Sequence, residues 1–244
     1  MIAALPMSIS PSSMSNRLLA GLPLDDITRL VANIHNVQVS VGTVLYEPGE
    51  VIKNIYFPND SLISLWALVE ERMTLEVALV GCEGVLGSSA ALGNNVSGVR
   101  AIVQRAGTVS CIDSEHFCTE FKKNFTLQKI IYCYNSNLLA QVIQIAVCSR
   151  FHLLEARLAR SLLTTRDRLQ SEKFHLTHEF LAHALGVRRV GVTKAASALQ
   201  QKQIITYSRG NIEIVDAYGL ETVSCRCYEL TKNIGGNTLS NYFI

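Results

Sequence analysis

The sequence lacks the segments that mark membrane-spanning, exported and catalytic proteins. No run of about 18 apolar residues is free of polar interruption, and the N-terminus has no positive region leading into an apolar core and a cleavage site. It also contains no Gly-rich phosphate loop, no Ser-His-Asp arrangement and no His-rich metal motif. We therefore expect a soluble, cytoplasmic protein that is not an enzyme and does not bind a membrane.

The cysteines follow no disulfide or metal-binding spacing. The seven of them are Cys82, Cys111, Cys118, Cys133, Cys148, Cys225 and Cys227. An odd number spread over a sizeable chain, with no C-x-x-C pair, is typical of reduced thiols in a cytoplasm. Cys225 and Cys227 are too close in sequence for an ordinary disulfide. We interpret all seven as buried thiols, and we expect neither a metal ion nor an iron–sulfur cluster.

The chain is long and apolar enough to form one large domain or two modest ones, since its 244 residues are 48% hydrophobic. From Val37 to about Asp113, short apolar or alternating runs are separated by Gly, Pro, Asn and Asp. This pattern predicts an all-β domain, either a barrel or a jelly roll.

Residues 126–149 form a long helix that carries little charge. Apolar residues recur at spacings of three and four, and they cover more than one face. One face can cover the β domain, and the other then needs a partner, most simply the same helix of a second copy in a parallel coiled coil. The alternative is a fully buried helix of a monomer. The residues predicted for the dimer helix are Ile131, Tyr134, Leu138, Val142 and Ile145.

The segment from Thr177 to Val215 has the order helix, tight turn, helix and two-stranded hairpin. Ala182 supplies a small side chain where two helices cross, and Gly186 supplies the positive φ that the turn needs. These features predict a winged helix-turn-helix, with an ordinary α-helical hairpin as the alternative. Residues 150–210 also hold 11 of the 22 basic residues but only 4 of the 20 acidic ones. Such a surface can neutralise DNA phosphates, although a charged face is often merely solvated.

Specific side chains of this segment have suitable chemistry for DNA. Arg188 and Arg189 open the second helix, where arginine can bind guanine through two hydrogen bonds. Val190 can contact a thymine methyl group, and Arg209 is expected at the tip of the wing near the phosphates. Thr177 caps the first helix. The full predicted DNA-binding set is Thr177, Arg188, Arg189, Val190, Thr193, Lys194, Ser197 and Arg209.

Three stretches carry a resemblance to a known family. Residues 154–160 (LEARLAR), 176–182 (LTHEFLA) and 207–210 (YSRG) are similar to the Crp/Fnr superfamily of bacterial transcription regulators. The resemblance implies an α+β protein: a cyclic-nucleotide-binding-like β-roll (jelly roll) at 18–125, a dimerisation helix at 126–149, a winged helix-turn-helix at 150–222 and a tail at 223–244. It also implies a homodimer that regulates transcription and binds double-stranded DNA, with RNA polymerase as a further partner and the β-roll as a sensory domain.

The resemblance places an effector pocket at Gly84, Val85, Gly87, Arg100 and Ala101. Members that bind cyclic AMP have a Gly-Glu pair whose Glu holds the ribose, followed later by an Arg that holds the phosphate. Val85 stands at the position of that Glu and cannot accept the ribose hydrogen bond, so we expect no cyclic AMP binding. The N-terminal cysteine cluster of Fnr-type members is also missing, and the effector stays unknown. The alternative function is a small-ligand-binding module whose basic helices contact a protein partner.

Overall fold

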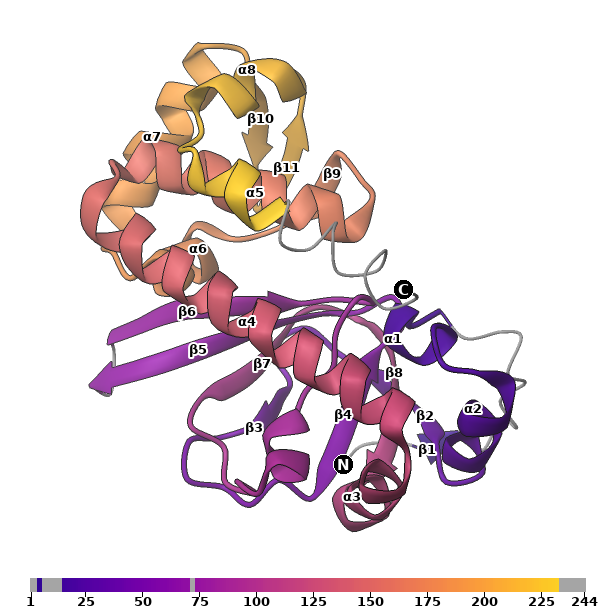
Figure 1. Ribbon diagram of the computed structural model, residues 1–244. Helices are drawn as coiled ribbons and strands as arrows, with labels where there is room; N and C mark the ends of the chain where they lie inside the picture. Colours follow the sequence, from indigo (N-terminus) through magenta and orange to yellow (C-terminus); the bar gives the residue numbers. More distant parts are fainter. Residues whose placement is uncertain (1–3, 6–14, 71–72, 233–244) are drawn as a thin grey trace. The chain divides into compact units, whose positions relative to one another are not determined.

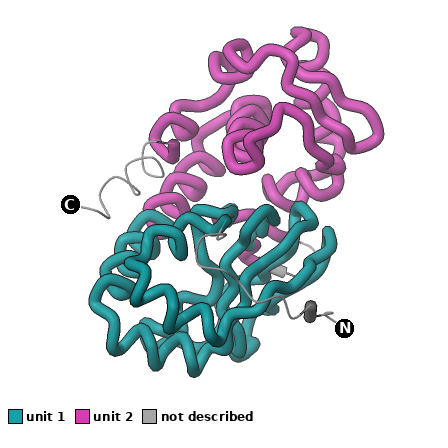
Figure 2. Tube along the Cα trace, turned by 90° about the vertical axis from the view of Figure 1, so that its right-hand side faces the viewer, with its two compact units in different colours: residues 1–65, 79–138, 238–244 teal, residues 66–78, 139–237 magenta. Residues whose placement is uncertain are grey.

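The computed structural model describes residues 4–5, 15–70 and 73–232 of the chain. Two compact units are present (Figure 2). Among the described residues, unit 1 comprises 4–5, 15–65 and 79–138, and unit 2 comprises 66–70, 73–78 and 139–232. One division between them therefore falls inside the long helix, which the sequence analysis treats as a segment of its own.

The predicted β-roll is confirmed by two four-stranded sheets (Figure 1). One has the strand order β1-β2-β8-β4 and the other β3-β7-β5-β6. Their strands are β1 (Ala4–Leu5), β2 (His35–Val39), β3 (Val44–Tyr46), β4 (Asn54–Pro58), β5 (Leu62–Glu70), β6 (Met73–Val80), β7 (Arg100–Arg105) and β8 (Gly107–Asp113). The accompanying helices are α1 (Arg17–Ala20), α2 (Leu24–Val31), the 3-10 helix η2 (Ser88–Leu92) and α3 (Ser114–Lys123).

The core of unit 1 gathers the apolar side chains of these strands. Ile55, Phe57 and Ile112 are fully buried, and the Phe57 ring meets Phe117 of α3 edge-on at 5.9 Å between centroids. Burial of such side chains is the main term that stabilises the unit. Asn16, itself buried, donates hydrogen bonds to the carbonyl oxygens of Pro58 at 2.8 Å and Gly84 at 2.9 Å, which fixes the start of α1 against the roll.

The long helix α4 (Phe125–Phe151) begins and ends close to the predicted bounds. By length and composition it could also cross a membrane, a test that core helices of soluble proteins pass as well. Ile131 and Tyr134 belong to the core of unit 1, and Ile145 is buried too. These three residues of the predicted dimer face are therefore covered by their own chain, whereas Leu138 and Val142 are half-buried. A helix that is apolar all round does not reveal from periodicity which side its own chain covers.

A different apolar row on α4 is exposed. Tyr132, Leu139 and Ile143 are 53%, 60% and 55% exposed. Together with Ser136 and Ala146, also exposed, they recur at spacings of four, three, four and three. That alternation is typical of the seam of a coiled coil. The exposed seam, Tyr132, Ser136, Leu139, Ile143 and Ala146, lies one residue, or about 100°, from the predicted row.

Unit 2 contains the predicted helix-turn-helix and wing. Its elements are α5 (Leu154–Leu169), β9 (Lys173–His175), α6 (His178–Leu185), α7 (Arg189–Gln201), β10 (Ile205–Ser208), β11 (Asn211–Ile214) and α8 (Ala217–Val223). Leu158, Leu162, Val192 and Leu199 form the centre of its core. The sheet has the order β10-β11-β9, and the sequence analysis missed β9 because three residues are too few for an alternating pattern.

The chain continues past α8 into folded structure. Residues 227–232 are helical, and the Tyr228 hydroxyl donates a hydrogen bond to Asp167 of α5 at 2.7 Å. We refer to residues 224–232 as the C-terminal segment. The first part of the predicted tail is thus packed against α5, and residues 233–244 lie outside the described residues.

We predict that Ile131→Ala lowers the free energy of unfolding by about 2–5 kcal/mol, because it removes a fully buried side chain and leaves a cavity. Leu24→Ala, which truncates a 68% exposed side chain of the same unit, is the matched control and should change it by less than about 0.5 kcal/mol. Urea denaturation followed by circular dichroism measures both. Equal effects would show that Ile131 is not a core residue.

Candidate nucleic-acid interface

Local rules of helix capping position α6 and the turn that follows it. The Thr177 hydroxyl oxygen accepts a hydrogen bond from the Phe180 amide at 3.1 Å, as expected for an N-cap residue. Gly186 ends the helix with φ +64°, a conformation that suits glycine. The Val187 amide then donates to the Ala182 carbonyl at 3.0 Å, which closes the turn. Thr177, placed in the predicted DNA-binding set, is therefore a structural cap.

The helix α7 has one buried and one exposed face. Val192, Ala195, Ala196 and Leu199 point into the core of unit 2. The exposed face carries five of the predicted residues: Arg189, Val190, Thr193, Lys194 and Ser197. Arg188, also exposed, is the N-cap residue of the same helix. The structure thus brings these six predicted residues together on one helix, all open to solvent.

The wing is a tight hairpin. Ser208 pairs with Asn211, and the two residues between them, Arg209 and Gly210, have φ values of +51° and +86°. Positive φ at both central positions is the turn that best fits the twist of two antiparallel strands. A Cβ at Gly210 would lie 2.5 Å from the His175 ring, so this turn accepts glycine alone without rearrangement. Arg209 stands exposed at the tip, as predicted.

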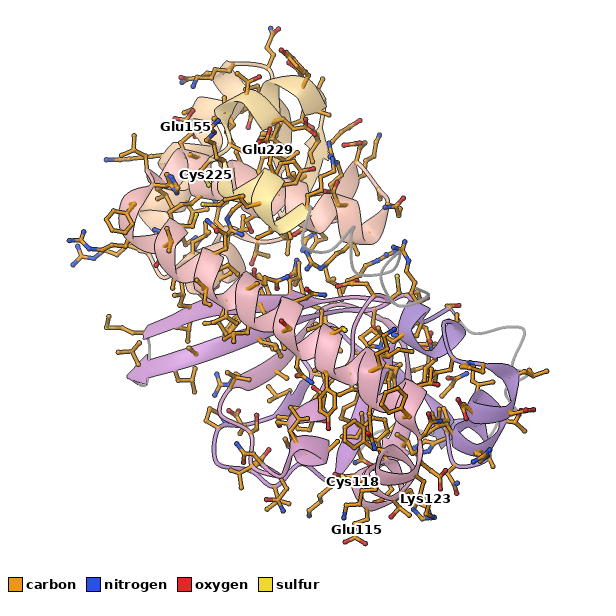
Figure 3. The ribbon with its side chains drawn as sticks, viewed as in Figure 1. Glu115, Cys118, Lys123, Glu155, Cys225 and Glu229 are labelled. Atoms are coloured by element: carbon orange, nitrogen blue, oxygen red, sulfur yellow. The ribbon has the colours of Figure 1, made fainter. Side chains whose placement is uncertain are left out.

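Several basic side chains of residues 150–210 are buried or paired with carboxylates of the same chain. Arg157 and Arg160 are buried. Lys173 pairs with Glu213 at 3.0 Å, and Lys202 pairs at 2.6 Å with Glu155, which Figure 3 labels. Arg166 pairs with Asp167 at 2.8 Å and with Glu221 at 3.3 Å. The count of basic residues therefore overstates the charge that a ligand would meet.

Four exposed cations of α7 and the wing define a smaller basic face. Within residues 15–70 and 73–232, no ion pair to a carboxylate involves Arg188, Arg189, Lys194 or Arg209. Three of them come from α7 and its N-cap, and one comes from the wing. Exposed, unpaired guanidinium and ammonium groups are free to bind phosphate oxygens or base edges.

His178 of α6 contacts both the wing strand β10 and α7. Its ring stacks on Tyr207 of β10 at 4.0 Å between centroids, and its Nδ1 lies 3.0 Å from the Thr193 hydroxyl on α7. Partial burial and the charge of Arg189 both lower the pKa of His178. The Thr193 hydroxyl also donates to the Arg189 carbonyl at 3.1 Å, so it is less available to DNA than the sequence predicts.

The residues predicted for the effector pocket lie in unit 1, partly within its core. Val85 and Ala101 are buried in unit 1. Gly87 has φ +83°, and a Cβ at Gly87 would lie 2.7 Å from the Tyr46 hydroxyl group. Arg100 pairs with Glu47 at 2.9 Å. The effector pocket at these residues therefore stays a prediction.

A hollow of about 370 Å³ lies beside Tyr46 in the same unit. It is lined by Leu45, Tyr46, Glu50, Val51, Lys53, Asn54 and Tyr56, none of which belongs to the predicted pocket.

A known family of DNA-binding domains matches the segment that holds α6, α7 and the wing. Residues 156–223 match the family model of the Crp-like helix-turn-helix domain. This match includes α6, α7 and the wing, and it supports DNA binding by this segment. A search of the curated proteins found no match.

Solved structures share the fold of the chain. A protein from Eubacterium rectale described as a Crp/Fnr-family transcriptional regulator has a TM-score of 0.69 at 18% identity, covering 84% of this chain and 96% of its own. FixK2 from Bradyrhizobium japonicum has a TM-score of 0.69 at 13% identity, covering 79% and 98%. The c-di-GMP-responsive regulator CLP of Xanthomonas campestris has a TM-score of 0.66 at 16% identity, covering 79% and 99%.

We predict that Arg189→Ala raises the pKa of His178 partway toward 6.5, because the repelling charge is removed while the burial remains. NMR titration of the ring protons measures the shift. Arg188→Ala is the control, since Arg188 is an adjacent exposed arginine that does not act on this pKa. The same pKa in both variants would contradict the assignment. The pKa of His178 is lower in the folded protein than in the unfolded chain. As the pH falls below 6.5, the unfolded chain therefore binds a proton at His178 first, and the free energy of unfolding declines.

Proposed function

We propose that this chain, a transcriptional regulator of the Crp/Fnr type by its fold and its helix-turn-helix domain, binds a specific DNA sequence as a homodimer. The observation that carries the proposal is the basic face of α7 and the wing. It joins four exposed cations, unpaired within the described residues, to a helix whose opposite side is buried. A rigid helix that presents arginines at its N-terminal end has the shape and chemistry to read the major groove.

The exposed α7 residues divide by the contact that each can make. Arg189 can bind a guanine edge through two hydrogen bonds, and Val190, 59% exposed, can contact a thymine methyl group. Lys194 and Arg209 supply charge for phosphate oxygens. Ser197 can donate to a base or a phosphate. Base contacts determine sequence preference, whereas phosphate contacts determine affinity and its dependence on salt.

The exposed seam of α4 supports the homodimer. From residue 130 to 149 the helix has no charged side chain, and its exposed row contains Leu139 and Ile143. A contiguous apolar row open to water is a site of association. When the α4 helices of two chains pack in parallel, the exposed seam of one helix covers that of the other. The same pairing relates the two α7 helices by a two-fold axis, as a symmetric operator requires.

The β-roll is the sensory or regulatory part of this proposal. Its ligand is not cyclic AMP, since Val85 offers no acceptor to a ribose and lies in the core. Arg100, the expected phosphate ligand, is held by Glu47 instead. RNA polymerase is the further partner through which DNA binding acts on transcription, and the site of action is the cytoplasm.

We predict that Arg189→Ala reduces the discrimination between the operator and a scrambled duplex by about 1–3 kcal/mol, while much of the salt-dependent nonspecific affinity remains. Fluorescence anisotropy with both duplexes over a range of salt concentrations measures this. Lys202→Ala is the control, because it removes an exposed cation that is already paired with Glu155. If Arg189→Ala discriminates between the two duplexes as well as the wild type does, Arg189 does not read the DNA sequence. If the wild type binds no duplex at all, the basic face is better explained by a protein partner.

We predict that Leu139→Glu converts the dimer into a monomer, because it places two carboxylates in the apolar seam. Sedimentation velocity measures the change. Leu24→Glu is the control, since Leu24 is 68% exposed and lies on α2, outside the seam. A wild type that sediments as a monomer, or a Leu139→Glu variant that remains a dimer, would contradict the seam.

A further inference from the structure

Four metal-ligating side chains meet in the interior of unit 2. They are Cys148, His152, Cys225 and Cys227. One ligand atom from each, three thiol sulfurs and one imidazole nitrogen, lies within 4.8 Å of all the others. All three cysteines are buried, and they form a small cluster with Ala156 packed against it. The sequence analysis kept these residues apart, because 77 positions separate Cys148 from Cys225.

Two elements build this cysteine-histidine cluster. Cys148 lies in the last turn of α4, and His152 follows four residues later, which places both on one side of the helix end. Cys225 and Cys227 belong to the C-terminal segment, and Figure 3 labels Cys225. Each element therefore contributes two of the four groups.

The spacing of the four atoms fits a single tetrahedral ion. The Cys148 and Cys225 sulfurs are 3.5 Å apart, and the Cys227 sulfur is 3.5 Å from His152 Nδ1. In a tetrahedron with Zn–S bonds of about 2.3 Å, neighbouring ligand atoms lie about 3.8 Å apart. An iron–sulfur cube needs a wider spread, since each ligand binds a different iron atom. We propose that Cys148, His152, Cys225 and Cys227 bind one Zn²⁺ ion.

The charge around the cluster fits the proposed ion. Zn²⁺ with three thiolates and a neutral imidazole carries one net negative charge, which a buried site must offset. Arg160, only 7% exposed, lies close enough to Cys148 for its side chain to interact with that thiol. In the described part of the chain its Nε has no hydrogen-bond partner and no carboxylate pairs with it. The zinc–thiolate centre supplies the missing counter-charge.

A hydrogen bond to one ligand is already in place. The Gln144 side chain donates from its Nε2 to the Cys227 sulfur at 2.8 Å. Hydrogen bonds from outside the coordination sphere orient metal ligands and stabilise the thiolate form. This contact positions the Cys227 sulfur for a cation.

Bound zinc would fasten the C-terminal segment to the end of α4. Tyr228 already joins that segment to α5 through hydrogen bonds with Arg166 and Asp167. The ion would add two bonds to the segment and two to the end of α4, in a region where the hydrophobic cluster consists of little more than the cysteines themselves. This role is structural, and it does not depend on the DNA-binding proposal.

Cobalt binding and thiol protection test the proposal on the full-length chain. The protein is stripped of metal with a chelator under reducing conditions and titrated with Co²⁺, then with Zn²⁺. We expect one Co²⁺ per chain, with the intense visible bands of tetrahedral thiolate coordination, and its displacement by Zn²⁺. Alkylation followed by mass spectrometry should show zinc protecting Cys148, Cys225 and Cys227 while the other four cysteines do not change. Thiol mapping uses the wild type, so it does not depend on a variant that folds.

Three variants and a control complete the test. Cys225→Ser should lose the tetrahedral spectrum, and Gln144→Leu should keep it with an affinity about 10–100-fold lower. His152→Gln should alter the spectrum while the protein stays folded. Cys118→Ser on α3 should bind metal as the wild type does (Figure 3).

Two results would overturn the zinc site. One is a wild type with only a pale octahedral cobalt spectrum and no protected thiol. The other is a metal-free protein, isolated without oxidant, that contains a Cys148–Cys225 disulfide.

Discussion

The close crossing of α6 and α7 is the constraint on which the proposed DNA-binding surface depends. Ala182 is a small buried side chain of α6, and Gly186 forms the turn with φ +64°. Val192 and Leu199 then anchor α7 in the core of unit 2. Once one side of α7 is buried, its 3.6-residue period leaves a single face for solvent. Arg189, Lys194 and their neighbours are exposed because of this packing. Their orientation is therefore a property of the core rather than of the side chains themselves.

Sequence reasoning predicted this surface well because its signals are local. The N-cap at Thr177, the positive φ at Gly186 and the turn at Arg209 each follow from the residue types. It failed where the answer depended on contacts between distant residues. Three residues predicted for the dimer face of α4 are buried in the chain itself, since a helix that is apolar all round does not reveal its inner face. The ion pairs of Arg166, Lys173 and Lys202 were equally invisible in a count of charges.

The cysteine-histidine cluster shows the same limit for chemistry. Spacing rules recognise metal sites whose ligands come in short motifs, and Cys-x-Cys alone is a weak signal. Only the fold brings Cys225 and Cys227 to Cys148, and only the fold reveals that Arg160 is buried beside them without a carboxylate among the described residues. The site belongs to the same unit as α6 and α7. Its ligands lie at the end of α4 and beyond α8, outside the proposed DNA-reading face.

The central claim, that α7 reads sequence in a two-fold symmetric dimer, is tested most directly by selecting bound duplexes from a random DNA pool. The full-length protein is used, with and without cyclic nucleotides. The account predicts an enriched site with two inverted half-sites, spaced by about one turn of the double helix or a multiple of it. It also predicts that cyclic AMP leaves the enrichment unchanged. Failure to enrich any sequence under any condition, by a protein shown to be folded, would contradict the account.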